Sequence, residues 1–163
     1  FFSDFNYFNT SVKEKTRFEK FLKKDFFLPY KLNNNKNFAY INLVKYGCFI
    51  GSSTVIFKKN VIEKTGLFKE EYKFITDYNF FLDIAKYFNI FCSKHSLTTY
   101  RMHENQSTIK MSNILFYEMN KLYLKFYMDS SLSFLTKFLV VKRQIKYIIS
   151  YYIKKFFFKY TYN

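Results

Sequence analysis

The sequence predicts a mixed α/β fold, in which a few strands alternate with helices first and helices alone follow. The 163-residue chain is 49% hydrophobic and 25% aromatic, which supplies a packed core and excludes a disordered chain. Its 3 Gly and 1 Pro disfavour a turn-rich all-β sandwich. The apolar pattern changes to purely helical near residue 110. We therefore expect one unit at residues 1–110 and a basic, aromatic helical extension at 111–163.

Strand and helix signals alternate in the first unit. Four segments have the aromatic, apolar or β-branched pattern typical of strands: residues 1–8, 52–57, 90–93 and 97–102. A capping-box start predicts a helix at 12–24, and a short helix is predicted at 59–64, which Gly66 would end. Residues 25–37, with a Pro and three consecutive Asn, predict a loop.

A helical period begins at Tyr78 and returns later in the chain. The apolar face of the first such helix would be Phe80, Phe81, Ile84, Ala85 and Phe88, opposite Asn79, Asp83 and Lys86. A second helix would bury Leu115, Met119, Leu122 and Phe126 and carry Glu118, Lys121 and Lys125 on its wet side. Helix is predicted again from Leu132 to Tyr160.

Taken singly, the polar residues near these elements have simple structural interpretations. Asp77 precedes a helical pattern, as an N-cap would. Arg101 and His103 alternate at the end of a strand and would form an exposed polar edge. Gly51, Ser52 and the next serine fit a loop that enters a strand.

Their order and spacing are more specific than any one of them. Ile50-Gly51-Ser52-Ser53-Thr54-Val55 is followed by a short helix, Gly66-x-Phe68, Asp77-Tyr78 at a helix start, and Tyr100-Arg101-x-His103-Glu104-x-x-Ser107. Over about Tyr40 to Thr108 this pattern resembles the family 2 glycosyltransferases of bacterial cell-surface polysaccharide synthesis. The resemblance implies a GT-A fold and inverting transfer of a sugar from a nucleoside diphosphate to an acceptor hydroxyl.

The resemblance also implies roles for individual residues. Asp77 matches the general base that takes the acceptor proton, and Thr76 stands where the family has a glutamate. Ser52, Ser53 and Thr76 would bind the acceptor. Arg101 and His103 would meet the donor diphosphate, and His103 would ligate a divalent metal, Mn²⁺ or Mg²⁺. A structural role for His103 is the alternative, since one histidine does not make a metal site.

The family holds its metal and nucleotide through an Asp-x-Asp motif, and no Asp-x-Asp occurs in these 163 residues. We therefore expect the chain to be the acceptor-side, C-terminal half of such an enzyme. The metal would be held mostly by the other half, and the chain alone would be inactive. Its partners would be a nucleotide-sugar donor and a glycan or lipid-linked acceptor.

The net charge of +15 predicts an anionic partner: nucleic acid, an anionic membrane or a phosphorylated substrate. The segment 133–160 mixes Lys and Arg with Phe, Tyr and Ile, and would either lie in a membrane interface or form a core helix pair with a solvated basic face. We expect a cytoplasmic protein, peripheral on the inner face of the cell membrane. No segment is apolar enough to span it.

Two further classes remain as alternatives. A nucleic-acid-binding module is disfavoured, because no RNP-like, zinc-ligand or helix-turn-helix signature is present. A membrane-surface protein without catalysis is the other. Cys48 and Cys92 have neither metal nor redox spacing, which favours a reducing compartment.

Overall fold

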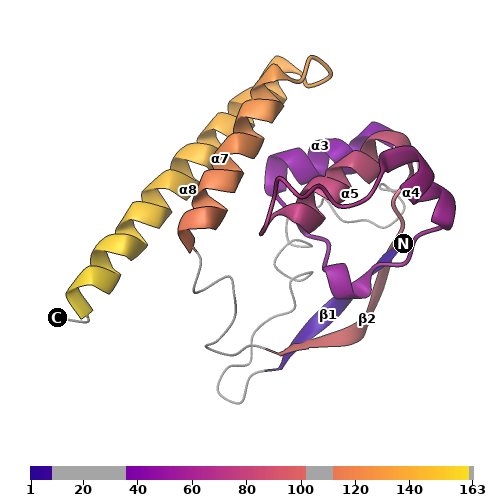
Figure 1. Ribbon diagram of the computed structural model, residues 1–163, viewed down its shortest axis with the longest axis horizontal. Coiled ribbons are helices and arrows are strands. Elements are labelled where there is room, and N and C mark those ends of the chain that lie inside the picture. Colours follow the sequence, from indigo (N-terminus) through magenta and orange to yellow (C-terminus); the bar gives the residue numbers. More distant parts are fainter. Residues whose placement is uncertain (9–35, 102–111, 162–163) are drawn as a thin grey trace.

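A two-stranded sheet with covering helices makes up one part of the molecule, and a long helical hairpin makes up the other (Figure 1). The computed structural model describes residues 1–8, 36–101 and 112–161. Its elements are β1 (Phe2–Phe8), α3 (Lys36–Tyr46), the 3₁₀ turn η1 (Ser52–Thr54), α4 (Lys59–Thr65), α5 (Thr76–Tyr87), β2 (Cys92–Arg101), α7 (Ser112–Met128) and α8 (Phe134–Thr161). The predicted mixed α/β class, with helices predominating, is confirmed.

The sheet joins segments that are far apart in the sequence. β1 runs parallel to β2, with Phe2 opposite Cys92 and Phe8 opposite Arg101. Parallel neighbours require a long crossover, and here the crossover includes α3, α4 and α5. The strand predicted at 1–8 is confirmed, whereas the two short strands predicted between 90 and 102 form the single strand β2.

The strand predicted at Ser52–Phe57 is wrong. Its first residues form η1, in which both the backbone N–H and the hydroxyl of Thr54 donate to the Gly51 carbonyl, at 2.9 and 2.8 Å. Within this segment Val55 alone forms a bridge, antiparallel to Phe2. Serine and threonine hydroxyls compete with ladder hydrogen bonds in this way, so the β-branched composition was misleading.

The short helix predicted at 59–64 and the helix predicted from the apolar period that begins at Tyr78 are confirmed as α4 and α5. Gly66 ends α4 at φ 77°, and its N–H donates to the Ile62 carbonyl at 2.8 Å. In α5 the predicted apolar face is buried except for Phe88, which is half-buried. Asn79, expected on the wet side, is buried as well, because α5 packs against α3 and α4 on different sides.

The sequence analysis missed α3. Residues 36 and 37 of the predicted loop are its first residues; the rest of that loop and the helix predicted at 12–24 lie outside the described residues. The buried residues of α3 are Ala39, Tyr40, Asn42, Leu43 and Val44. They include adjacent positions and a polar one, so no clean helical period was visible.

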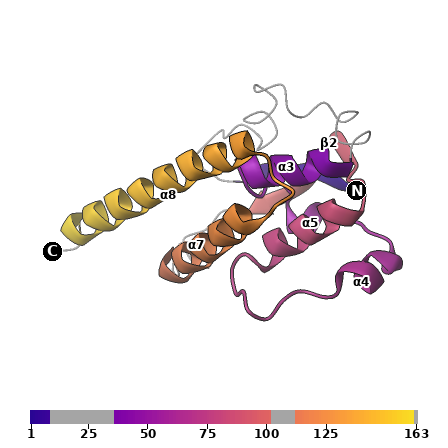
Figure 2. The ribbon, with the colours of Figure 1, turned by 90° about the horizontal axis from the view of Figure 1, so that it is seen from above.

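The hairpin is formed by α7 and α8, which lie side by side (Figure 2). Phe116 stacks on Tyr151 with ring centroids 4.0 Å apart, and Gln144 donates to Asn120 Oδ1 at 2.8 Å. Both predicted helices are confirmed, with α8 beginning at Phe134. The boundary expected at 110/111 falls within residues 102–111, which lie outside the described part.

The hairpin docks on the first part of the chain through Arg143. This basic residue of the 133–160 segment is half-buried, and its Nη1 donates to the Val44 carbonyl at the end of α3, at 2.8 Å. Gly47, at φ 91°, lies against it: a Cβ there would be 2.6 Å from Arg143 Nη2. A cation at a helix C-terminus satisfies carbonyls that the helix leaves free. Among the described residues, no helix is long and apolar enough to cross a membrane.

Candidate functional site

Asp77 and Ser52 meet at the start of α5, although 25 residues separate them in the chain. Ser52 Oγ donates to Asp77 Oδ2 at 2.5 Å, and the Tyr78 N–H donates to Asp77 Oδ1 at 2.7 Å. Ile75, not Asp77, occupies the N-cap position, so the capping interpretation of Asp77 is wrong. The Asp77 carboxylate is partly exposed and lies in the first turn of α5. It can accept a proton from a hydroxyl that reaches it.

The other two residues predicted to bind the acceptor lie differently. The Thr76 hydroxyl donates back to the Tyr72 carbonyl at 2.6 Å, so it ties the preceding turn. Ser53 is exposed, next to Ser52 on η1. Of the three, the structure brings Ser52 into contact with Asp77.

The predicted diphosphate-binding residues cannot be placed against this pair. Arg101 is the last residue of β2, where its backbone pairs with Phe8. His103 lies outside the described residues, so its role as a metal ligand stays a prediction. In the part of the chain that is described, no group of three His, Cys, Asp or Glu side chains could hold a metal ion.

Glu118 is the residue of this region that the sequence analysis misplaced. It was expected on the wet side of α7, yet it is 4% exposed. Its carboxylate accepts the N–H groups of three consecutive residues, Lys73 at 2.7 Å, Phe74 at 2.9 Å and Ile75 at 3.1 Å. Such a row of amides binds anions, and here α7 supplies the anion.

Glu118 therefore fixes the turn that leads directly into Thr76 and Asp77. α5 needs this acceptor from another helix because its N-cap residue, Ile75, has no side-chain oxygen to accept the first free N–H groups. The sequence contains one signal of this arrangement, the apolar Ile75 at the start of a strongly predicted helix. An apolar side chain cannot accept the free N–H groups there, so another part of the chain must supply the acceptor.

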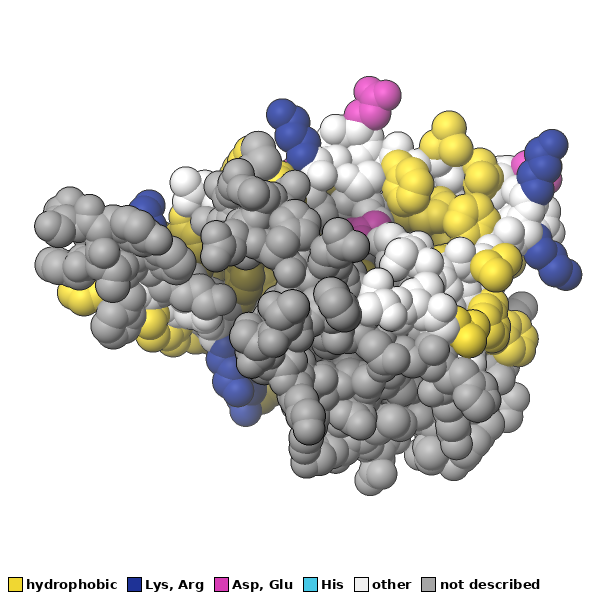
Figure 3. Space-filling view, turned by 90° about the horizontal axis from the view of Figure 1, so that it is seen from below, with side chains coloured by type: hydrophobic (Ala, Val, Ile, Leu, Met, Phe, Trp, Pro, Cys, Tyr) yellow, Lys and Arg dark blue, Asp and Glu magenta, His cyan; other side chains and the backbone are white. Residues whose placement is uncertain are grey.

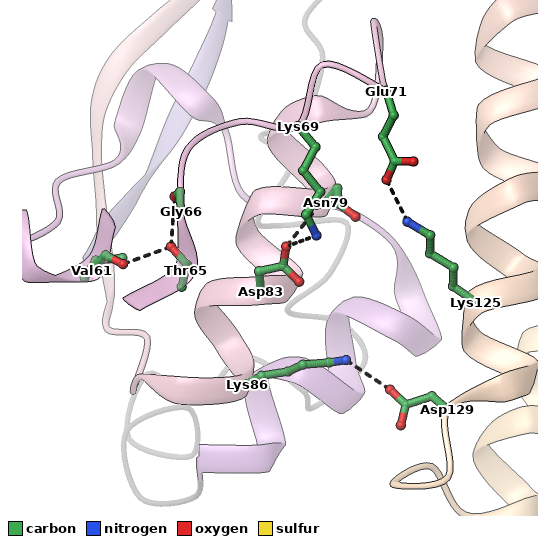
Figure 4. Close-up of polar contacts among 10 residues, drawn as sticks. All are labelled: Val61, Thr65, Gly66, Lys69, Glu71, Asn79, Asp83, Lys86, Lys125 and Asp129. Atoms are coloured by element: carbon green, nitrogen blue, oxygen red, sulfur yellow. Dashed lines mark hydrogen bonds and ion pairs between the residues drawn. The ribbon is translucent and has the colours of Figure 1, made fainter. Parts of the chain in front are cut away.

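A second polar cluster lies between α5 and the hairpin, around a pocket of about 200 Å³ (Figure 4). Lys69 pairs with Asp83 at 2.7 Å, and Lys86 pairs with Asp129 at 3.3 Å. Tyr40 donates to Asp129 Oδ2 at 2.5 Å. Each carboxylate here has a cation beside it, so the cluster joins two parts of the fold and leaves no free base.

The pKa values in this cluster follow from those contacts. Burial alone would raise the pKa of Asp129, but hydrogen bonds from Ser131 and Tyr40, together with Lys86, hold it well below its usual range. Burial and the bond to Asp129 raise the pKa of Tyr40 far above its usual value. On the exposed side, Lys125 and Lys121 lower the pKa of Glu71 to about 2.

The larger pocket, of about 540 Å³, is apolar. It lies between the start of β1, the η1–α4 segment and the second half of α5, where Phe81 and Ile84 follow Asp77 on the same face of the helix. Among the described residues that line it, Lys58 has the one ionisable side chain. Figure 3 shows hydrophobic side chains gathered at this end of the molecule. The pocket suits an apolar group, and its lining offers no acid–base chemistry.

Comparison with protein-family models, curated proteins and solved structures gave no match. The site is therefore interpreted from its own geometry and from the motif order.

Proposed function

We propose that this chain is the acceptor-side half of an inverting glycosyltransferase of the GT-A type. The observation that carries the proposal is the hydrogen bond between Ser52 and Asp77. It joins the Gly-Ser-Ser turn and the helix-start aspartate, two motifs whose order in the sequence suggested the family. It also orients a partly exposed carboxylate, the kind of group that general base catalysis requires.

In the proposed reaction, Asp77 takes the proton of an acceptor hydroxyl while the acceptor oxygen attacks the anomeric carbon of the donor sugar. The bond to the diphosphate breaks on the opposite face of that carbon and its electron pair leaves with the diphosphate, so the configuration inverts. Ser52 orients the carboxylate through Oδ2, and Glu118 holds the turn before Asp77 in place. Fixing a base to within a fraction of an ångström is a large part of such catalysis.

The nucleotide-sugar donor would be bound by residues outside this chain, because the sequence has no Asp-x-Asp motif. The cation of the family, Mn²⁺ or Mg²⁺, would belong to that donor-binding part. The acceptor would be a glycan or a lipid-linked glycan, and the apolar pocket that begins one turn beyond Asp77 favours an acceptor with an apolar group. An acceptor of this kind fits a cytoplasmic protein, peripheral on the inner face of the cell membrane.

The test is sugar transfer by a protein in which this chain is joined to its donor-binding half. Asp77→Asn should lower kcat about 10²–10⁴-fold and leave donor affinity nearly unchanged, because only proton transfer is lost. Asp83→Asn, the same change six residues further along α5, is the matched control and should keep near-normal turnover. Near-normal turnover of Asp77→Asn would remove Asp77 from the mechanism.

The division between the two halves has its own test. Calorimetric titration of the 163-residue chain with uridine and guanosine diphosphate sugars, with Mn²⁺ or Mg²⁺ present, should give no measurable heat of binding. Micromolar binding of any of these donors would contradict the proposal that the donor site lies elsewhere.

A further inference from the structure

The outer face of α8 carries a continuous apolar strip. One side of the helix packs on α7 through residues such as Val140, Gln144 and Tyr147. The opposite side exposes large apolar side chains that recur every three to seven residues and are between 47% and 64% exposed: Leu135, Phe138, Ile145, Ile149, Tyr152 and Phe156. On a helix they fall within an arc of about 100°, the width of a face that is normally buried against something.

Basic residues border this strip. By helical position, Lys142 and Lys146 follow one edge, and Lys137 and Lys155 follow the other. The Lys142 ammonium group lies over the Phe138 ring, 4.7 Å from its centre, so a cation is in direct contact with the strip. The 28 residues of α8 include no Asp or Glu. On the face seen in Figure 3, the hairpin end likewise shows hydrophobic and basic side chains together.

The apolar strip continues around the tip of the hairpin. Met128 at the end of α7 and Phe134 at the start of α8 are 86% and 87% exposed. Isolated apolar residues on a surface need no explanation, but a strip that runs along α8 from Leu135 to Phe156 does. Its length and its basic borders match those of helices that lie in the plane of a membrane interface.

The charges decide between the possible occupants. A second copy packed on this strip would bring Lys142 and Lys146 against the same residues of its partner, with no acidic side chain on α8 to pair with them. A nucleic acid would match the lysines but would leave Ile145 and Ile149 against phosphates. An anionic lipid surface offers negative head groups at the borders and an apolar interior beneath the strip.

We propose that the outer face of α8 is a docking surface for an anionic phospholipid membrane. The helix lies flat, with Ile145 and Ile149 among the acyl chains and the bordering lysines at the head groups. The inner side of α8 stays packed on α7, so the rest of the chain keeps its structure on the membrane. This surface is independent of the proposed sugar transfer, because Asp77 and Ser52 take no part in it.

The test is sedimentation of the 163-residue chain with vesicles of phosphatidylglycerol and phosphatidylcholine in equal parts, and with vesicles of phosphatidylcholine alone. We expect binding to the anionic vesicles to be about tenfold tighter or more, and to weaken as salt is added. Lys142→Glu with Lys146→Glu should lower it about tenfold or more. Lys58→Glu with Lys59→Glu changes the net charge equally, on α4, and should lower it much less.

A second pair of variants tests the apolar contact. Ile145→Asp with Ile149→Asp should abolish vesicle binding, whereas Ile56→Asp with Leu67→Asp, at even more exposed positions, should not. Circular dichroism confirms that each variant is folded.

Three results would overturn the proposal. Equal losses from the two lysine pairs would mean that net charge alone drives binding. A dimer in sedimentation that Ile145→Asp with Ile149→Asp dissociates, without vesicle binding, would assign the strip to a second copy. Tighter binding to a single-stranded oligonucleotide than to anionic vesicles would assign the lysines to nucleic acid.

Discussion

Three carboxylates in this chain differ because of what surrounds each one. Glu118 is buried against three backbone N–H groups, and Asp129 accepts from hydroxyls beside Lys86. Asp77 accepts from one serine hydroxyl and one N–H, and is partly exposed. Of the three, Asp77 has neither a cation pair nor a full set of backbone donors. It is therefore the one of the three that we propose as the base for a substrate hydroxyl.

Glu118→Ala should be strongly destabilising. The three N–H groups before α5 would lose their acceptor, and each buried unsatisfied group costs about 1–3 kcal/mol, so we expect a loss of about 3 kcal/mol or more in the free energy of unfolding. Glu118→Gln keeps one acceptor oxygen, so its free energy of unfolding should lie between those of Glu118→Ala and wild type. Urea unfolding measures both, with Glu70→Ala on the exposed loop as a control expected within about 0.5 kcal/mol of wild type. Equal stability of Glu118→Ala and Glu70→Ala would show that these bonds contribute little.

Asp129 should make stability depend on acid pH. Its pKa is lowered in the folded protein, so the stabilisation is fully present above the unfolded value of about 4 and is lost as pH falls through the folded value. Unfolding free energies of wild type and Asp129→Asn should therefore differ most above about pH 5 and converge towards pH 2. A difference that stays constant over this range would mean that the Asp129 charge is not what Lys86 and Tyr40 stabilise.

At the scale of elements, the sequence predicted those with a clean period. The helices α5 and α7 each show apolar residues at helical spacing, and Gly66 marks the end of α4. The strand predicted at Ser52–Phe57 was wrong because a threonine hydroxyl favoured a turn over a ladder. α3 was missed because it is buried by both α5 and α8, and contacts that far apart in the chain leave no local pattern.

Removal of α8 should unfold more than the hairpin. Val140 is fully buried and Arg143 closes the end of α3, so a chain ending at residue 133 would expose part of the core. We expect a loss of about 5 kcal/mol or more, comparable to the whole stability of a small domain. Removing only residues 154–163 should have little effect on the melting temperature followed by circular dichroism. A chain ending at 133 with the melting temperature of wild type would show that α8 is an independent extension.

At the scale of the whole molecule, the α7–α8 hairpin contributes both to the proposed acceptor site and to the proposed membrane-docking surface. Its α7 helix supplies Glu118 to the turn before Asp77, and its α8 helix presents the apolar strip. From the sequence, the motif order predicted that Asp77 and Ser52 belong to one site, and the structure places them in contact. The role of Glu118 was not predictable, because it depends on three backbone groups some 45 residues away. The roles of Arg101 and His103 stay predictions.

The central claim is that Ser52 and Asp77 form an acceptor site for a sugar hydroxyl. The most direct measurement is an amide NMR titration of the 163-residue chain with methyl glycosides of hexoses, 6-deoxyhexoses and N-acetylhexosamines. We expect at least one of these classes of glycoside to bind with a dissociation constant in the millimolar range, about −4 kcal/mol. The changes in amide chemical shift should centre on Ser52, Asp77 and Tyr78. These changes should vanish in Asp77→Asn and persist in Asp83→Asn. The absence of any change at these amides, or equal binding by Asp77→Asn, would contradict the account.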